Sequence, residues 1–194
     1  MKLCIVIPCY NEKNTIREIV DAVRSAPYDS KEIIIVDDGN NDATWEQIGL
    51  LSQTKKSVVG LRLGRNFGQH SALLAGVRKA KYSQIVTIDD DLQNPPEEIP
   101  KLLAKLVNGV DVVYGVSAQV RQIAWRRFTS RITKAIFARV LGFESAISIS
   151  SFRAFRTQLR DGFAGELGPH VSLDALLTWS TSRFSTLEVE HHAR

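Results

Sequence analysis

The sequence is poor in cysteine, in long apolar runs and in unbalanced charge, and each shortage excludes a class of protein. Its 194 residues include two cysteines, Cys4 and Cys9, which argues against a disulfide framework or a cysteine zinc site and fits a reducing cytoplasm. No apolar run approaches the roughly 18–20 residues that cross a bilayer, so we expect no transmembrane helix within these residues. The first apolar stretch is too short for a secretory signal peptide. A net charge of +4 is too small to cause disorder.

The charge is distributed unevenly along a chain whose length predicts one domain, because domains commonly take about 100–200 residues. Residues 1–110 carry 14 basic and 14 acidic side chains, whereas residues 111–194 carry 11 and 7. Nine basic residues lie between positions 121 and 160: Arg121, Arg126, Arg127, Arg131, Lys134, Arg139, Arg153, Arg156 and Arg160. Such a stripe indicates an anionic partner (nucleic acid, phosphate or an acidic membrane surface), although a solvated helix face has the same pattern.

Short apolar runs alternate with helix-periodic segments through the first 115 residues. The runs predict strands at 3–7, 32–36, 58–63, 84–88 and 111–115, with Pro8 ending the first. The periodic segments predict helices at 14–25, 42–52, 67–80 and 97–107. This order predicts an α/β fold in which helices cover both faces of a mostly parallel sheet.

The remaining residues predict a different set of elements. Residues 121–141 have apolar positions at helical spacing with arginine and lysine between them, which predicts a basic amphipathic helix. We also expect a strand within 146–156, a helix at 172–180 and a final strand at 184–190. Asp174 opens the third of these segments, where it can act as a general base or as a helix cap.

Polar residues follow four of the predicted strands, at 8–12, 37–44, 64–68 and 89–93. In open α/β sheets the ligand binds outside the carboxyl ends of the strands, so these clusters predict a site at one edge of the sheet. No G-x-G-x-x-G or Walker lysine motif follows the first strand, which argues against dinucleotide binding and P-loop hydrolysis.

The cluster after the fourth strand contains three consecutive carboxylates that repel one another. While the chain stays extended, Asp89 and Asp91 point to the same side, and Gln93 continues that alternation. These oxygen donors suit Mg²⁺ or Mn²⁺, and such a metal can neutralise a diphosphate leaving group. A solvated acidic loop is the alternative. In the 37–44 cluster, a carboxylate can accept hydrogen bonds from a ribose hydroxyl or a base, or it can make a turn and cap a helix. His191, close to the end, can face a site.

Five segments together resemble glycosyltransferase family 2, and in particular its polyprenyl-phosphate branch, typified by dolichyl-phosphate mannose synthases. They are PCYNE at 8–12, VDDGNNDAT at 36–44, RNFGQHSALLAG at 65–76, DDDLQNPPEEIP at 89–100 and DVVYG at 111–115. The resemblance implies a GT-A fold and an inverting transfer of a hexose from a nucleotide-diphosphate sugar (UDP- or GDP-linked). It also implies that residues 1–194 form a single catalytic domain, with a nucleotide-sugar-binding half (1–115) and an acceptor-side half (116–194).

The resemblance also implies roles for individual residues. Those that match the nucleoside-binding positions are Pro8, Tyr10, Glu12 and Asp38. Asp89 and Asp91 match the DxD pair that holds the metal and the diphosphate with Gln93, and Asp90 takes the variable middle position. Basic residues beside the acceptor phosphate match Arg121, Arg126, Arg127 and Arg131. Asn40 stands where the family usually has serine. The sequence ends at Arg194, before the last motif and the membrane helices of many relatives, so we expect a shortened acceptor side.

The partners implied are a nucleotide-sugar donor, a polyprenyl phosphate and the inner face of the cytoplasmic membrane, with Mg²⁺ or Mn²⁺ as the metal. A homo-oligomer or a membrane-anchoring subunit is a further possibility. We expect no nucleic-acid binding, because no set of stacking aromatic residues accompanies the basic stripe. Two alternatives stay open. One is a soluble relative that glycosylates a hydroxyl, with Asp174 as base, and the other is a non-catalytic subunit that binds nucleotide sugars.

Overall fold

The computed structural model describes residues 2–11, 13–26, 30–107, 109–117, 150–165 and 172–192. The strands are β1 (Lys2–Cys9), β2 (Ser30–Asp37), β3 (Val58–Arg62), β4 (Gln84–Thr87), β5 (Val112–Ser117), β6 (Arg153–Arg156) and β7 (Phe184–Val189). The helices are α1 (Ile16–Ser25), α2 (Thr44–Thr54), α3 (Gln69–Lys79), α4 (Ile99–Lys105) and α7 (Leu173–Ser180), with 3-10 turns η1 (Pro96–Glu98) and η2 (Thr157–Phe163). Strand and helix alternate from β1 to β5, which confirms the predicted order.

All seven of these strands join one sheet in the order β3-β2-β1-β4-β6-β5-β7. The neighbours β3–β2, β2–β1, β1–β4 and β5–β7 pair in parallel, and only β6 runs antiparallel to the strands beside it. Because β6 reverses direction between them, β4 and β5 point the same way. The carboxyl ends of β1, β2, β4 and β5 therefore meet at one edge, as the predicted mostly parallel sheet requires.

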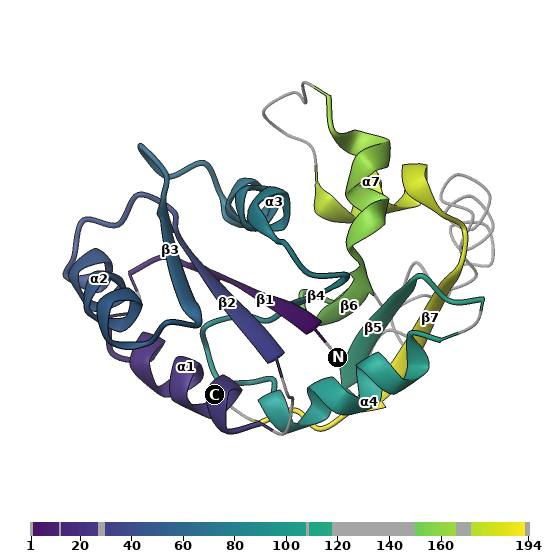
Figure 1. Cartoon of the computed structure of the whole chain (residues 1–194), viewed down its shortest axis with the longest axis horizontal. Coiled ribbons are helices and arrows are strands. Elements are labelled where there is room, and N and C mark those ends of the chain that lie inside the picture. Colours follow the sequence, from purple (N-terminus) through teal and green to yellow (C-terminus); the bar gives the residue numbers. More distant parts are fainter. Residues whose placement is uncertain are drawn as a thin grey trace, which may run out of the picture.

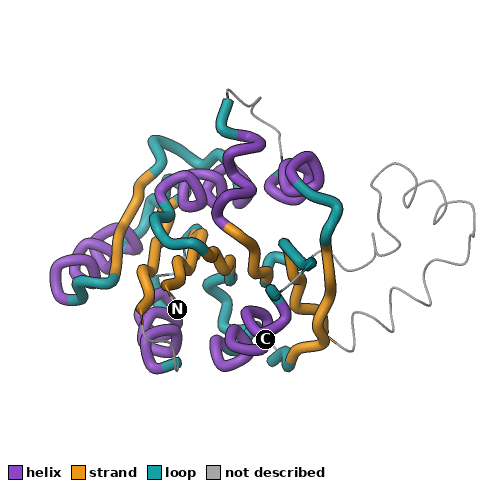
Figure 2. Tube along the Cα trace, turned by 45° about the vertical axis from the view of Figure 1, so that its right-hand side comes forward, coloured by secondary structure: helices purple, strands orange, loops and turns teal. Residues whose placement is uncertain are grey.

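Helices cover both faces of the sheet, as Figure 1 shows, and the view turned by 45° in Figure 2 again places the strands between two helical layers. Alternate side chains of β1 face opposite layers. Leu3, Ile5 and Ile7 pack with the buried faces of α1, α2 and α4. Cys4 and Val6 pack with α3 and α7. Full burial of one such aliphatic side chain contributes roughly 1.5–3 kcal/mol, so packing against both layers stabilises the position of β1.

Helix α3 lies especially close to β1, because Gly76 faces the sheet. A Cβ built at Gly76 would lie 2.3 Å from Cγ1 of Val6. A glycine at this position therefore allows α3 to pack closely on β1. The close approach holds α3 against the sheet, and the start of this helix carries part of the site described below.

Most boundaries differ from the predictions by one or two residues, and three of the differences have a structural explanation or change the type of element. β1 continues through Pro8 to Cys9, because the Cys9 carbonyl accepts from the N–H of Asp38 on the β2 side. The backbone of Pro8 faces β4 instead, and the ladder between β1 and β4 ends at Val6. The missing N–H of Pro8 thus costs no ladder bond. The helix predicted at 97–107 begins as η1 and continues as α4. Of the strand predicted within 146–156, the structure describes Arg153–Arg156 as β6.

The basic helix predicted at 121–141 lies outside the described residues. Among the helices that are described, none has the length and apolar character needed to span a membrane.

Candidate active site

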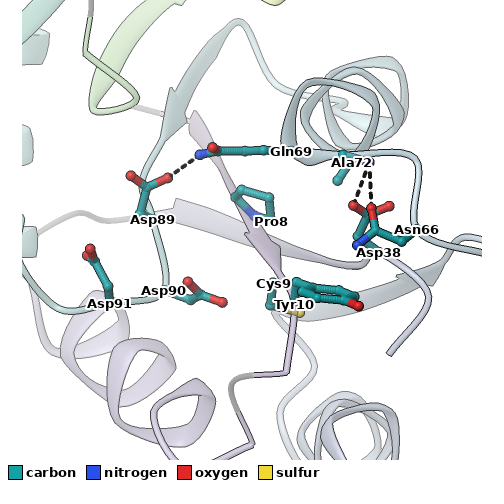
Figure 3. A pocket seen from close by; sticks show the side chains of 11 residues that line it. Pro8, Cys9, Tyr10, Asp38, Asn66, Gln69, Ala72, Asp89, Asp90 and Asp91 are labelled. Atoms are coloured by element: carbon teal, nitrogen blue, oxygen red, sulfur yellow. Dashed lines mark hydrogen bonds between the residues drawn. The ribbon is translucent and has the colours of Figure 1, made fainter. Parts of the chain in front are cut away.

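A cavity of about 350 Å³ opens at the edge of the sheet where β1, β2 and β4 end. Its walls are formed by Pro8, Cys9, Tyr10, Asp38, Asn66, Gly68, Gln69, Ala72, Asp89, Asp90 and Asp91 (Figure 3). The cavity thus brings together residues from three strand ends and from the start of α3. Five residues with predicted site roles lie outside the described part of the chain: Glu12, Arg121, Arg126, Arg127 and Arg131.

Asp38 joins the end of β2 to the loop before α3. Its side chain is buried, with Oδ1 accepting from Phe67 N–H and Oδ2 from Gly68 N–H, both at 2.8 Å. The next residue, Gly39, has a φ of +74°, and a Cβ there would lie 2.3 Å from the carbonyl carbon of Arg65. The two loops therefore pack backbone against backbone, which only glycine permits at this position.

Asn40, the departure from the family's usual serine, makes the turn after β2. Its N–H donates to Oδ1 of Asp37 at 2.8 Å, and its own Oδ1 accepts from Asn11 N–H at 2.6 Å. Asn40 thus ties the end of β1 to the same turn. The side chain at the start of α2 that accepts a backbone N–H is Asp42, which bonds Thr44 at 3.0 Å.

Asp89, Asp90 and Asp91 follow β4 after one residue, Ile88, and the middle aspartate points away from the other two. Figure 3 shows Asp90 directed towards Cys9 and Tyr10, with Asp89 and Asp91 on the other side. The alternation predicted for Asp89 and Asp91 is therefore present. The chain then turns, because Leu92 has a φ of 60°. The prediction that the extended alternation continues to Gln93 is therefore wrong.

A second cavity of about 270 Å³ lies on the other side of Asp89 and Asp91. Besides these two carboxylates it is lined by Gln93, Asn94, Gly115, Val116, Ser117, Ser150, Ser151 and His191. Gln93 thus reaches the site through the turn at Leu92. His191 is brought here by the chain after β7, where His192 N–H donates to the Gln93 carbonyl at 2.8 Å. Asp89 and Asp91 therefore form the boundary between two adjoining cavities.

Neutral donors surround the carboxylate of Asp89. Oδ1 accepts from Nε2 of Gln69 at 2.7 Å, and Oδ2 accepts from the Ser151 hydroxyl. Burial raises the pKa of Asp89, and the hydrogen bond from Ser151 only partly offsets this while the charge of Asp91 adds to it. Burial and the charge of Asp90 likewise raise the pKa of the Cys9 thiol, which favours its protonated form.

The site presents oxygen donors in excess of cationic partners, which fits a divalent metal. Asp91 accepts one bond at Oδ1, from Gln93 N–H at 3.1 Å, and a carboxylate offers about four acceptor positions. The described residues contain no cluster of three or more histidine, cysteine or acidic side chains that would enclose a metal. Mg²⁺ and Mn²⁺ commonly use one or two carboxylates and complete their shells with water and substrate phosphate. Asp89, Asp91 and the amide oxygen of Gln93 fit that mode.

Asp174 occupies neither of the positions expected for it. Ser172 caps α7, since its Oγ accepts from Ala175 N–H at 3.1 Å. The buried carboxylate of Asp174 instead accepts from the Tyr114 hydroxyl at 2.8 Å and forms an ion pair with Arg153. It lines neither cavity.

Sequence reasoning missed Gln69 and Ser151, the two side chains that bond Asp89. Gln69 begins α3, and Ser151 lies in the segment whose alternation predicted a strand. That alternation was the available signal for Ser151, because a strand paired with β4 brings the residues before it close to Asp89.

Comparison with known proteins identifies relatives of this chain. The family model described as Glycosyl transferase family 2 matches residues 4–163. An undecaprenyl-phosphate 4-deoxy-4-formamido-L-arabinose transferase of Pseudomonas aeruginosa is 36% identical over 159 residues, which is 80% of this chain and 47% of that protein. The chain spans about half the length of the curated relatives it matches.

Solved structures share the fold at low sequence identity. The mannosyltransferase PcManGT from Pyrobaculum calidifontis, in complex with GDP-Man and Mn²⁺, superposes with a TM-score of 0.70 at 20% identity, covering 96% of this chain and 55% of that one. Glucosyl-3-phosphoglycerate synthase from Mycobacterium tuberculosis, bound to Mn²⁺, UDP and glucosyl-3-phosphoglycerate, gives 0.70 at 18% identity, covering 100% and 72%. These likenesses establish the GT-A-type fold.

Proposed function

The chain belongs to glycosyl transferase family 2, and we propose that it transfers a hexose from a nucleotide-diphosphate sugar to a polyprenyl phosphate. The proposed reaction uses Mg²⁺ or Mn²⁺, inverts the anomeric centre and takes place at the cytoplasmic face of the membrane. Residues 1–115 bind the donor in this proposal, and residues 116–194 contribute the acceptor side.

The observation that carries the proposal is that Asp89 and Asp91 line both cavities. A nucleotide-diphosphate sugar has a diphosphate at its centre, with a nucleoside at one end and a sugar at the other. With the nucleoside in the larger cavity and the sugar in the smaller, the diphosphate lies on the two carboxylates. Like charges then meet, so this pose needs a cation between them.

We assign the nucleoside to the larger cavity because its lining offers aromatic, apolar and acceptor groups. Tyr10 is 46% exposed at the end of β1 and can stack on a base. Each oxygen of Asp38 accepts one backbone N–H and retains a lone pair for a base or ribose donor. Pro8 and Glu12, on either side of Tyr10 in the sequence, complete the proposed nucleoside set.

The chemistry asks the protein chiefly to position two anions. A metal bound by Asp89, Asp91 and Gln93 would stabilise the diphosphate leaving group. An acceptor phosphate oxygen forms the new bond to the anomeric carbon as the bond to the diphosphate breaks, and the electron pair leaves with the diphosphate. A phosphate monoester has its second pKa near 6, so it is largely ionised at neutral pH and needs no general base. Asp174, the residue considered as a general base, is paired with Arg153. This pairing supports an acceptor that needs no base, such as a phosphate.

The acceptor assignment draws on the relative and on the sequence. The Pseudomonas aeruginosa protein is named for transfer to undecaprenyl phosphate. We propose that Arg121, Arg127 and Arg131 offset the charge of the acceptor phosphate in this chain and attract the anionic membrane surface.

A turnover assay tests the proposal. The chain, in detergent with Mn²⁺, is supplied with UDP- and GDP-hexoses and either polyprenyl phosphate or the matching unphosphorylated polyprenol. We expect a glycolipid of inverted anomeric configuration from the phosphate alone and none with EDTA. Turnover of the polyprenol or of a free sugar hydroxyl would contradict the acceptor assignment. Donor binding without turnover of any acceptor would identify a non-catalytic subunit.

Arginine variants separate the acceptor from the donor in the same assay. The change Arg127→Ala combined with Arg131→Ala should weaken use of polyprenyl phosphate more than binding of the donor nucleotide. Arg24→Ala, in the last turn of α1, is the matched control and should change neither. Equal loss of acceptor use and donor binding in the double variant would count against the acceptor role.

A further inference from the structure

A buried guanidinium lies behind the candidate metal site. Arg153, the first residue of β6, is 1% exposed. It pairs directly with Thr87 of β4 on one side and with Tyr114 of β5 on the other. These three side chains therefore form a row across adjacent strands. Thr87 ends β4, two residues before Asp89, so the row leads towards the acidic cluster.

Helix α7 supplies the counter-charge to this row. Oδ1 of Asp174 accepts from Nη1 of Arg153 and from the Tyr114 hydroxyl, the latter at 2.8 Å. Burial and the charge of Asp174 raise the pKa of Tyr114, so its hydroxyl stays a donor at neutral pH. The guanidinium is thus held on one side by Asp174, and its Nε remains directed at Thr87.

Arg153 is connected with Asp89 through Thr87 and Ser151, and each hydrogen bond in this series has a fixed direction. Nε of Arg153 donates to Oγ1 of Thr87 at 3.1 Å, and an arginine nitrogen can only donate. The Thr87 hydroxyl hydrogen is therefore free for the Ser151 carbonyl, to which it donates. The Ser151 hydroxyl in turn donates to Oδ2 of Asp89. Four hydrogen bonds in series thus connect Asp174 with Asp89.

We propose that the Arg153–Asp174 pair positions the carboxylate of Asp89 through Thr87 and Ser151. This inference rests on the proposed function, in which Asp89 helps to hold the metal and the diphosphate. Asp174 is then a positioning residue rather than a general base. A buried ion pair adds little to stability over apolar residues of the same volume, so its place beside this site favours a role in orientation. Partners that orient metal-binding groups commonly change affinity by about 10–100-fold when they are lost.

The competing explanation is that the pair merely attaches α7 to the sheet. Two changes at Thr87 separate the explanations, because Thr87 does not touch α7's carboxylate. Thr87→Val removes the hydroxyl between Arg153 and Ser151, whereas Thr87→Ser keeps it. The double change Arg153→Met and Asp174→Leu removes the ion pair while keeping the volume close to the original. Asp111→Asn, at a buried carboxylate paired with Arg183 and Arg156 at the opposite end of the sheet, is the control.

The measurement is calorimetric titration of the chain and each variant with UDP and with GDP, with and without Mn²⁺, alongside thermal unfolding. Thr87→Val and the double variant should weaken the Mn²⁺-dependent binding by about 10–100-fold. Nucleotide binding without Mn²⁺, which is weaker than binding with Mn²⁺, should have the same affinity in these variants as in the wild type. A general loss of structure would lower that affinity as well. Thr87→Ser should keep the Mn²⁺-dependent binding. Asp111→Asn should lower the unfolding temperature but leave the Mn²⁺-dependent binding unchanged.

The outcomes distinguish this inference from the function on which it rests. If the unchanged chain binds neither nucleotide more tightly with Mn²⁺, the proposed function is wrong. If the unchanged chain shows that dependence and the folded Thr87→Val and double variants keep it in full, the positioning role is wrong. Equal losses in Thr87→Val and Thr87→Ser would also overturn it, because the hydroxyl would not matter.

Discussion

Asp111 at one end of the sheet and Asp38 and Asp89 at the other are held in opposite ways, although Asp37 beside Asp38 pairs with Arg62 at 3.3 Å. Before β5, Asp111 accepts from Nε and Nη2 of Arg183 at 2.8 and 2.9 Å and from the Thr181 hydroxyl at 2.7 Å. Arg156 adds a second ion pair at 3.4 Å. At the other end, Asp38 and Asp89 accept only from neutral donors in the described part of the chain. Matched charge stabilises the fold, and unmatched charge remains available to a ligand.

The pKa values follow the same division. Burial alone would raise the pKa of Asp111, but hydrogen bonds from Thr181 and Arg183 outweigh it and hold the pKa below the ordinary 3.8. For Asp89 burial dominates, Asp91 adds repulsion, and the pKa is raised. The molecule therefore tolerates an electrostatic cost at the candidate site that it avoids at the opposite end.

The largest expected effect follows the loss of an unmatched carboxylate. Asp91→Ala should abolish Mn²⁺-dependent nucleotide binding, because it removes a proposed metal ligand and leaves the core intact. Isothermal titration measures the loss. Asp21→Ala, at an exposed carboxylate paired with Lys55 on the surface, serves as control and should bind normally. Unchanged binding by a folded Asp91→Ala variant would remove the metal assignment.

A smaller effect is expected where a carboxylate holds a loop. Asp38→Ala releases the N–H groups of Phe67 and Gly68, and hydrogen bonds to charged groups contribute about 1.5–3 kcal/mol each. We expect nucleotide affinity to fall about tenfold or more, both with and without Mn²⁺, since 1.4 kcal/mol corresponds to a factor of ten. Asp42→Ala, in the same loop but bonded to Thr44, is the control. A loss confined to the Mn²⁺-dependent binding would contradict this role.

Stability should respond in the opposite sense to binding. Asp111→Asn should lower the free energy of unfolding by about 1–3 kcal/mol, because it weakens bonds to two guanidinium groups. Asp89→Asn should change it by less than about 1 kcal/mol, because the hydrogen-bond donors of Asp89 are neutral and Arg153 acts on its charge without a direct ion pair. Urea unfolding at neutral pH measures both. If Asp89→Asn proves the more destabilising of the two, the division between the ends of the sheet is wrong.

The smallest effect is in the pH dependence. A carboxylate whose pKa is lower in the folded state stabilises the protein above its unfolded pKa, and this is lost as pH falls through the folded value. The stability difference between wild type and Asp111→Asn should therefore be full at neutral pH and shrink below about pH 3.8. Urea unfolding across that range gives the curve. A difference that stays constant into strong acid would exclude the linkage.

The fold was largely predictable because its signals are local. Apolar runs such as 32–36 and the helix-periodic segments each indicate one element. The extension of β1 through Pro8 depends on where its neighbour β4 stops, which no local pattern contains. The reversal of β6 likewise depends on pairing between strands far apart in the sequence.

The candidate site was predictable where a strand end delivers a residue directly. Asp38, Asp89 and Asp91 follow β2 and β4, so the rule for parallel sheets placed them together. The contact of Asp174 with Arg153 was not predictable, because the two residues are 21 positions apart and the ion pair forms only when α7 packs on β6. Supporting residues reach a site through tertiary packing, whereas strand-end residues reach it through topology.

Titration of the chain with UDP and with GDP, with and without Mn²⁺, tests most directly whether the unmatched carboxylates serve a metal-bound diphosphate. We predict that one nucleotide binds much more tightly when Mn²⁺ is present. Inorganic phosphate should not take the place of that nucleotide. Equal affinity with and without Mn²⁺, or no binding of either nucleotide, would contradict the account.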